Sequence, residues 1–155
     1  MIRLHRHESA GEVVYDIAGQ FLLEADARRE GIVLGREFGD GVLSYRFAVG
    51  LPATSQERQL HVDFSPGRPT VTVYADGHRC LRHRWPDGSL CMWDPEAAEV
   101  ERWVLGDGLP ALATHARLHL YCEAECRAGK PWPKAEMAGE HPRKRHCPSC
   151  RGHGQ

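Results

Sequence analysis

The sequence predicts an α+β fold: an N-terminal helix, an antiparallel β-meander, a loop that carries a cysteine, and C-terminal helices. Three patterns carry this prediction. Apolar residues recur at helical spacing after residue 9, alternate with period two within residues 32–75, and return to helical spacing from about residue 109. The hydrophobic fraction of 41% and the charged fraction of 26% are typical of a globular protein, and 155 residues favour one main domain.

The first helix begins with a capping-box pattern, in which Ser9 is followed three residues later by Glu12. Gly31 is a candidate C-cap because glycine tolerates the left-handed conformation that ends many helices. We therefore expect one long amphipathic helix. Its expected core stripe is Val14, Ile17, Ala18, Phe21, Leu22 and Ala25.

The β-meander is predicted from alternating runs that turn signals separate. Residues 32–38 and 42–51 flank Gly39, Asp40 and Gly41, a typical hairpin sequence. A third run repeats the alternation, and residues 70–75 form a β-branched fourth run. One face of this antiparallel sheet should be buried.

Two further helices are expected after the meander. Asp94, Pro95 and Glu96 resemble a helix start, with Trp103 and Leu105 on the apolar side of that helix. The last helix should run from about 109 to 127 and stop near a glycine. Its expected core stripe is Leu109, Leu112, Ala113, Ala116 and Leu120.

Composition also bears on compartment and partners. No apolar run approaches the ~20 residues that a membrane span needs, and the N-terminus lacks a signal-peptide pattern, so we expect a cytoplasmic protein without a membrane partner. Six cysteines in such a protein favour metal binding or catalysis over disulfides. From residue 127 onward the sequence has seven Lys or Arg residues and two Glu residues. A basic tail, 128–155, therefore follows an acidic body, 1–127.

The body resembles ubiquitin-conjugating enzymes in the order of its elements and in three local patterns. The proline-rich run FSPGRPTVTV (64–73) is similar to the stretch that leads into the family's last strand. GSLCM (88–92) is similar to the family's Gly-x-Ile-Cys-Leu loop, and WVLGDGLPAL (103–112) to its downstream tryptophan and leucine-rich helix. The resemblance covers roughly residues 10–127.

The resemblance implies an acyltransferase whose nucleophile is Cys91. A cysteine of this kind accepts the C-terminus of a ubiquitin-like protein as a thioester from an activating enzyme, and an amine on a target protein then attacks it. Asp87 and Gly88 should place Cys91 in a reachable surface loop. The alternative is that Cys91 is a small apolar filler beside its large neighbours.

One position departs from the family. Typical members have an asparagine, in His-Pro-Asn, eight residues before the cysteine, and His83 stands there instead. An imidazole can donate a hydrogen bond to an oxyanion or take a proton from an amine, although His83 can equally be a surface residue of its loop. Asp87 and Asp94 should serve as turn and cap residues, with a weaker alternative role in orienting the amine.

This departure is a feature of divergent bacterial relatives, including those in antiphage operons beside cyclic-oligonucleotide synthases. The resemblance therefore implies a role in antiviral defence, and such a synthase is one candidate target.

The remaining cysteines suggest a structural zinc site. Cys147 and Cys150 have the spacing of a zinc-ribbon knuckle, and Cys122 and Cys126 are one helical turn apart. A Cys₄ site would tie the tail to the last helix. The alternative is a reduced tail without metal, and Cys80 is expected in the core. Further candidate ligands or neighbours of the ion are His115, His119, His141 and His146.

Two other classes of function stay open. The same fold can act as a non-catalytic adaptor that binds a partner enzyme, and the missing asparagine favours this alternative. A zinc-ribbon protein that binds nucleic acid is the second. We rank it lower, because the basic run 143–145 is short and has no interleaved aromatic residues.

Overall fold

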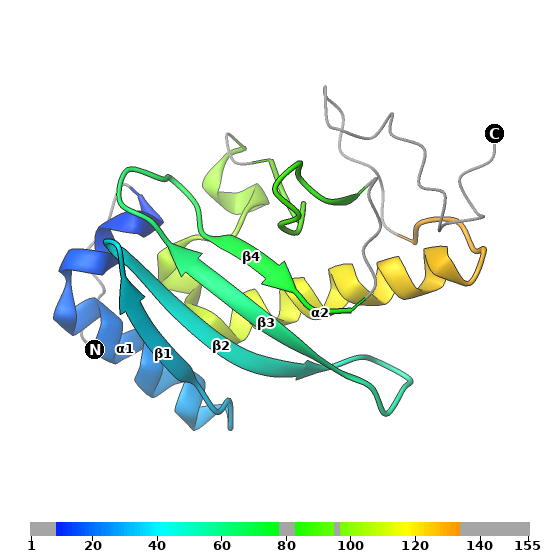
Figure 1. The fold of residues 1–155 in the computed structure, drawn as a ribbon, viewed down its shortest axis with the longest axis horizontal. Coiled ribbons are helices and arrows are strands. Elements are labelled where there is room, and N and C mark those ends of the chain that lie inside the picture. Colours follow the sequence, from blue (N-terminus) through cyan, green and yellow to red (C-terminus); the bar gives the residue numbers. More distant parts are fainter. Residues whose placement is uncertain (1–8, 78–82, 95–96, 134–155) are drawn as a thin grey trace.

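The computed structural model describes residues 9–77, 83–94 and 97–133. A four-stranded antiparallel sheet lies against a long C-terminal helix, and the N-terminal helix packs at one end of that helix (Figure 1). The prediction of an α+β fold with an antiparallel meander is confirmed. The elements are η1 (Ala10–Tyr15), α1 (Ile17–Arg29), β1 (Gly35–Gly39), β2 (Val42–Gly50), β3 (Glu57–Phe64), β4 (Thr72–Ala75), η3 (Glu99–Glu101), η4 (Leu105–Asp107) and α2 (Gly108–Arg127).

The N-terminal helix is two helices, so the prediction of one long helix is wrong. Residues 10–15 form the 3-10 helix η1, whose N-cap Ser9 makes no side-chain capping bond. The chain breaks at Asp16, whose carboxylate accepts a 3.0 Å hydrogen bond from the Gly19 amide and caps α1. Residue 11 must be glycine for η1 to pack here, because a Cβ at that position would lie 2.0 Å from the Ser65 carbonyl oxygen.

The break at Asp16 also changes which face of α1 is buried. Ile17 and Phe21, expected in the core, are 81% and 64% exposed, whereas Leu23 and Ala27 are buried. The two short helices have different rotational phases, so the apolar spacing read across both does not define one stripe. Gly31 ends α1 with a φ of +76°, as predicted.

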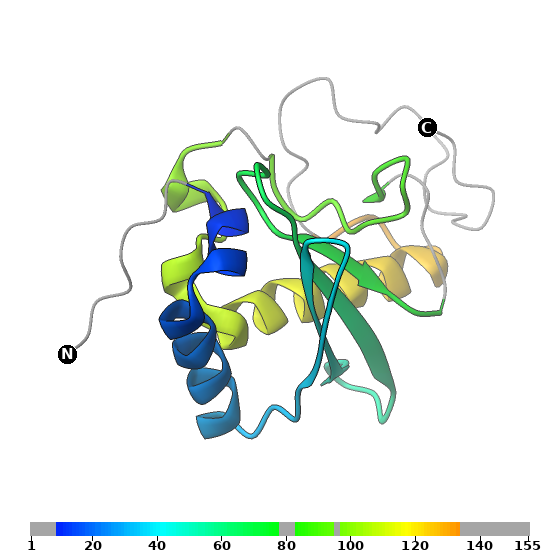
Figure 2. The same cartoon turned by 60° about the vertical axis from the view of Figure 1, so that its left-hand side comes forward.

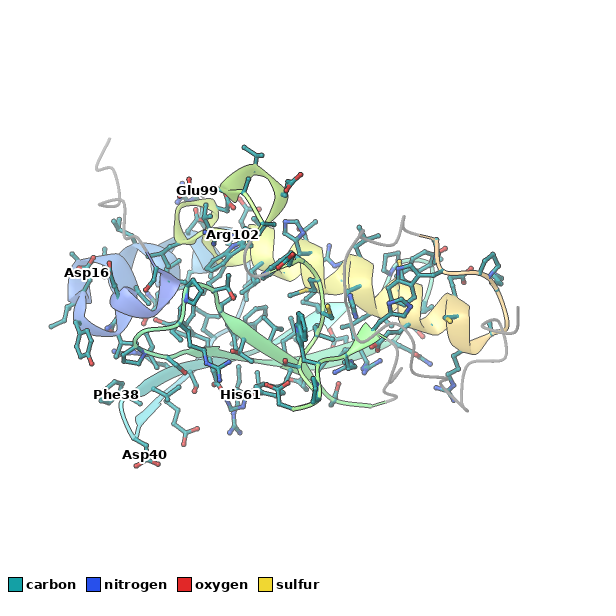
Figure 3. The ribbon with its side chains drawn as sticks, turned by 90° about the horizontal axis from the view of Figure 1, so that it is seen from above. Asp16, Phe38, Asp40, His61, Glu99 and Arg102 are labelled. Carbon is teal, nitrogen blue, oxygen red and sulfur yellow. The ribbon has the colours of Figure 1, made fainter. Side chains whose placement is uncertain are left out.

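The sheet follows the predicted meander, in the order β1-β2-β3-β4. Gly39 pairs with Val42, so Asp40 and Gly41 form a two-residue turn with φ angles of 52° and 75°, which match a type I′ hairpin. Alternate residues of β2, β3 and β4 are buried towards the helices. His61 points to the opposite face of the sheet (Figure 3).

Helix α2 confirms the prediction of a last helix near residues 109–127, and its five expected core residues are all buried. It runs along the sheet, and α1 crosses its N-terminal part (Figure 2). Residues 97–107 do not form the helix expected there but contain only the short turns η3 and η4. Trp103 is nevertheless fully buried, and its indole donates to the Gly108 carbonyl at 2.9 Å. No helix in the described ranges combines the length and hydropathy needed to cross a membrane.

Candidate active site

The cysteine-bearing segment, residues 83–94, folds back onto the free edge of β4. Arg84 and Leu90 form an isolated antiparallel bridge, and the Trp85 amide donates to the Ser89 carbonyl at 2.9 Å. The Leu90 amide donates to the Val73 carbonyl at 2.7 Å, which joins the segment to β4. Backbone hydrogen bonds therefore hold both the turn and its contact with the sheet.

The tip of this segment has the turn chemistry that the sequence predicts. The Asp87 carboxylate accepts hydrogen bonds from the Ser89 amide at 2.9 Å and the Ser89 hydroxyl at 2.6 Å. Gly88 has a φ of +87°, which favours glycine. Partial burial acts to raise the pKa of Asp87, but the Ser89 hydrogen bonds and the charge of Arg68 outweigh it and lower that pKa. Asp87 is therefore an ionised turn residue.

Cys91 directly follows this turn, but it is not the surface residue that the sequence predicts. It is only 7% exposed, and its amide donates to the His83 carbonyl at 3.2 Å. After Ser89 the chain returns to the sheet, so the neighbours Leu90, Met92 and Trp93 are also buried and Cys91 is enclosed with them. The structure thus joins the two predicted catalytic residues through their backbones.

His83 lies beneath an aromatic residue that follows α2. It is 6% exposed, and its ring stacks on that of Trp132 with centroids 3.5 Å apart and planes 16° apart. The ring of Trp132 also lies edge-on to that of His119, with ring centroids 5.3 Å apart. The alternative of a surface histidine is therefore wrong for His83, because the segment leading into the tail covers it.

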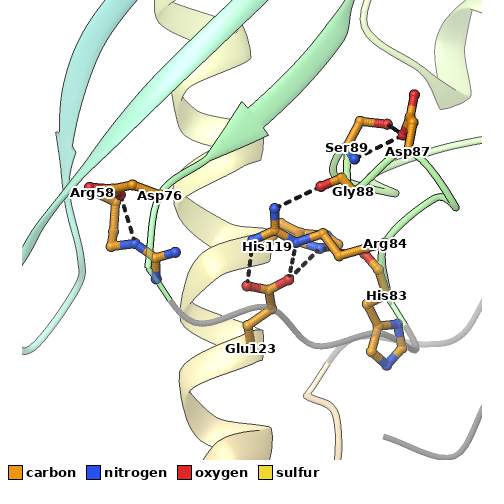
Figure 4. Close-up of polar contacts among 9 residues, drawn as sticks. All are labelled: Arg58, Asp76, His83, Arg84, Asp87, Gly88, Ser89, His119 and Glu123. Carbon is orange, nitrogen blue, oxygen red and sulfur yellow. Dashed lines mark hydrogen bonds and ion pairs between the residues drawn. The ribbon is translucent and has the colours of Figure 1, made fainter.

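Arg84 is equally buried and pairs with α2 (Figure 4). Its Nε and Nη2 atoms donate to the two carboxylate oxygens of Glu123 at 2.6 and 3.0 Å, and its Nη1 donates to the Gly88 carbonyl at 3.1 Å. Each of the two charged side chains is 2% exposed. No sequence pattern around Arg84 indicates that its side chain is buried.

The charge of Glu123 is strongly favoured in this setting. Burial acts to raise the pKa of its carboxyl group, but hydrogen bonds with His119 and Arg84 and their charge interactions outweigh burial and lower the pKa from 4.5 to about 2. The carboxylate is therefore ionised at neutral pH and balances the charge of Arg84.

His119 completes the contact between α2 and the cysteine-bearing segment. Its Nε2 lies 3.0 Å from the His83 carbonyl oxygen, the same oxygen that accepts from the Cys91 amide. A carbonyl only accepts, so the proton of this hydrogen bond must be on Nε2. Nothing in the sequence except the spacing of His119 and Glu123, four residues apart within the core stripe, indicates this network.

A pocket of about 340 Å³ lies between the start of β4 and the cysteine-bearing segment. Two indoles and three hydroxyl groups line it, and Arg68 and Asp87 contribute one charge of each sign. It adjoins Cys91 through the neighbouring Leu90 and through Trp93. Its lining residues are Arg68, Thr70, Val71, Thr72, Trp85, Pro86, Asp87, Ser89, Leu90 and Trp93.

Only half of the predicted metal site falls within the described residues. Cys122 and Cys126 are fully buried on α2, on the same helical face as His119 and Glu123. Among the described ranges no group of three or more His, Cys, Asp or Glu residues is placed to hold a metal. His115 packs edge-on against Trp93 with ring centroids 5.6 Å apart. Cys80, His141, Cys147, Cys150, His146 and the basic run 143–145 lie outside the described residues.

Comparison of the chain with protein-family models, with curated proteins and with solved structures finds no match.

Proposed function

We propose that this protein is a ubiquitin-conjugating-like acyl carrier that uses Cys91 as its nucleophile, in a bacterial antiphage pathway. The observation that carries the proposal is the placement of Cys91. It directly follows a rigid turn, on a segment that hydrogen bonds connect to both β4 and α2. The order helix, meander, cysteine-bearing segment, helix supports the proposal as well, because the resemblance rests on that order.

The proposed reaction has two acyl transfers. The Cys91 thiolate attacks the thioester carbonyl at the C-terminus of a ubiquitin-like protein, and the thiolate of the activating enzyme leaves. An amine of the target then attacks the new thioester, loses a proton, and expels the Cys91 thiolate. The pocket beside Cys91, with ionised Asp87 among its lining residues, is suited to an amine-bearing side chain.

The burial of Cys91 sets a condition on this reaction. A thiol that is 7% exposed cannot meet the C-terminus of another protein unless its surroundings move. The segment 128–133 is a candidate to move, because its Trp132 stacks on His83, whose carbonyl accepts from the Cys91 amide, and is not part of the main core. Binding of the loaded activating enzyme would then accompany displacement of Trp132.

The proposal can be tested without knowledge of the natural partners. A peptide ending in glycine, activated as a mercaptoethanesulfonate thioester, supplies the same reacting group as a loaded activating enzyme. The full-length chain should exchange with it and form a peptide adduct that a thiol reductant removes. Absence of any adduct after prolonged incubation at pH 8, in a chain whose Cys91 is alkylated by iodoacetamide and is therefore reachable, would contradict the proposed nucleophile.

His83 is proposed to serve the second transfer, as a donor to the oxyanion. His83→Ala should form the adduct nearly normally, but its adduct should discharge to added lysine ~10²–10³-fold more slowly, the usual loss for one missing oxyanion donor. His83→Asn, which restores the family's residue, should recover part of the rate. The rates are measured as loss of adduct on non-reducing gels.

His61→Ala is the matched control for this comparison, because His61 is on the opposite face of the sheet and contacts Asp63 and Tyr74. Equal discharge rates for His83→Ala and His61→Ala would show that another group stabilises the oxyanion.

The tail is proposed to be held by one structural zinc ion bound by Cys122, Cys126, Cys147 and Cys150. Two thiols four residues apart on a helix suit two of the four ligand positions of a tetrahedral thiolate site. The same helical face carries His119, whose ring lies edge-on to Trp132 with centroids 5.3 Å apart, which supports a tail that starts near these cysteines. The ion would supply no chemistry to the reaction and would only fix the start of the tail.

Protein produced in zinc-replete medium should contain about one zinc per chain. Cys147→Ser together with Cys150→Ser should release it, because two thiolate ligands are too few for a structural site, while the body stays folded. Zinc is measured with a chromophoric chelator, and folding by circular dichroism. Cys80→Ser is the control and should keep the metal. Absence of zinc from the wild-type chain would contradict the proposed metal site.

A non-catalytic adaptor is the second candidate, and a specific surface favours it. Tyr15, Ile17 and Phe21 are 76%, 81% and 64% exposed around the start of α1, whereas Cys91 is buried. Clustered exposed apolar residues often mark a protein interface. The adaptor would bind a partner enzyme through this surface and form no thioester, so the peptide assay distinguishes the two candidates.

A further inference from the structure

The buried pair of Arg84 and Glu123 connects the cysteine-bearing segment to the middle of α2. With each side chain only 2% exposed, both charges are removed from water at a large cost in hydration. Two hydrogen bonds between them, at 2.6 and 3.0 Å, form the bidentate geometry in which guanidinium and carboxylate interact best. Arg84 has a third contact, with the Gly88 carbonyl at the turn.

The same face of α2 also binds the other end of the turn. His119 donates to the His83 carbonyl, which in turn accepts from the Cys91 amide. Helix α2 therefore binds the His83 carbonyl before the turn through His119. Through Glu123 and Arg84 it also binds the Gly88 carbonyl within the turn (Figure 4). Cys91 follows immediately, so its backbone position depends on both contacts.

We propose that Arg84, Glu123 and His119 are positioning residues for Cys91: they fix the backbone around the thiol and keep it closed until a partner binds. This inference rests on the proposed function for its catalytic meaning, but the positioning itself is a property of the free protein. An apolar pair of similar volume could fill the same space with equal stability. It could not donate to the Gly88 carbonyl, so stability and the placement of Cys91 are separable.

The test is the rate at which iodoacetamide alkylates Cys91 in the full-length chain, measured from pH 6 to pH 9. Trypsin releases residues 85–102, or residues 83–102 where Met replaces Arg84, and both peptides contain Cys91 and no other cysteine, so mass spectrometry follows this thiol alone. Two variants separate the roles. Arg84→Lys keeps the charge but cannot reach Glu123 and Gly88 together, and Arg84→Met with Glu123→Leu replaces the ion pair by an apolar pair.

Both variants should alkylate about 10- to 100-fold faster than the wild type, the range expected when one hydrogen bond to a charged group no longer holds the segment closed. The pH dependence of the alkylation rate in both variants should also differ from that of the wild type, because the surroundings of the Cys91 thiol change. The double variant should show this faster alkylation while its urea midpoint stays close to that of the wild type. Arg58→Lys is the matched control, since Arg58 pairs with Asp76 away from Cys91, and its rate should not change.

A wild-type rate and pH profile in both variants would overturn the inference. So would acceleration that occurs only in step with a lowered urea midpoint, because loss of stability alone would then explain it. The assay contains no thioester, so its result is independent of the proposed reaction. Faster alkylation in the variants, together with no peptide adduct in those same variants, would support positioning and contradict acyl transfer.

Discussion

The Cys91→Ala variant is expected to form no reductant-sensitive adduct with the activated peptide, whereas the wild-type chain forms one. The physical reason is that only a thiolate among the side chains of this segment both attacks a thioester readily and yields a new thioester. Removing it should therefore abolish the reaction rather than weaken it. The adduct is measured by intact mass spectrometry before and after treatment with dithiothreitol.

Cys91→Ser provides the complementary variant. A serine hydroxyl gives an oxyester, which resists dithiothreitol, so any adduct should accumulate slowly and survive the reductant. Cys80→Ser is the control, because it removes a thiol that the proposal assigns to neither the acyl transfer nor the metal site. An undiminished, reductant-sensitive adduct in Cys91→Ala would assign the reaction to another cysteine.

Local sequence patterns predicted the elements whose causes are local. The Asp40-Gly41 turn needs positive φ angles at two positions, and its residue types suit that requirement. The alternation in β2 and the stripe of α2 match their burial. The prediction of one long first helix was wrong because the apolar spacing runs through Asp16, whose carboxylate accepts from the Gly19 amide and starts a new helix.

The same distinction applies to the candidate site. Cys91 and His83 are identifiable from a motif and its spacing, and Asp87 from turn chemistry. The burial of Cys91 and His83 is not, because it depends on partners far along the chain: His119 is 36 residues from His83, and the adjacent Arg84 pairs with Glu123, 39 residues away. A charged residue in an apolar helical stripe, such as Glu123, is the one signal that could have indicated a buried partner.

Replacing Glu123 alone by leucine is expected to lower the free energy of unfolding by about 3–5 kcal/mol, because Arg84 would stay buried without its counter-charge. Replacing both residues, Arg84→Met with Glu123→Leu, should recover most of that loss, since a packed apolar pair carries no cost of desolvating charges. The measurement is urea unfolding of the full-length chain at pH 7, followed by tryptophan fluorescence.

Glu37→Leu is the matched control, because Glu37 pairs with Arg46 at 3.4 Å on the exposed surface of β1 and β2. A pair of this kind contributes at most about 1 kcal/mol, so the control should unfold near the wild-type midpoint. Equal losses for Glu37→Leu and Glu123→Leu would mean that water reaches the buried pair. A double variant as unstable as Glu123→Leu would instead mean that α2 needs the charged pair itself, and faster alkylation of Cys91 in that variant would then count against the positioning role.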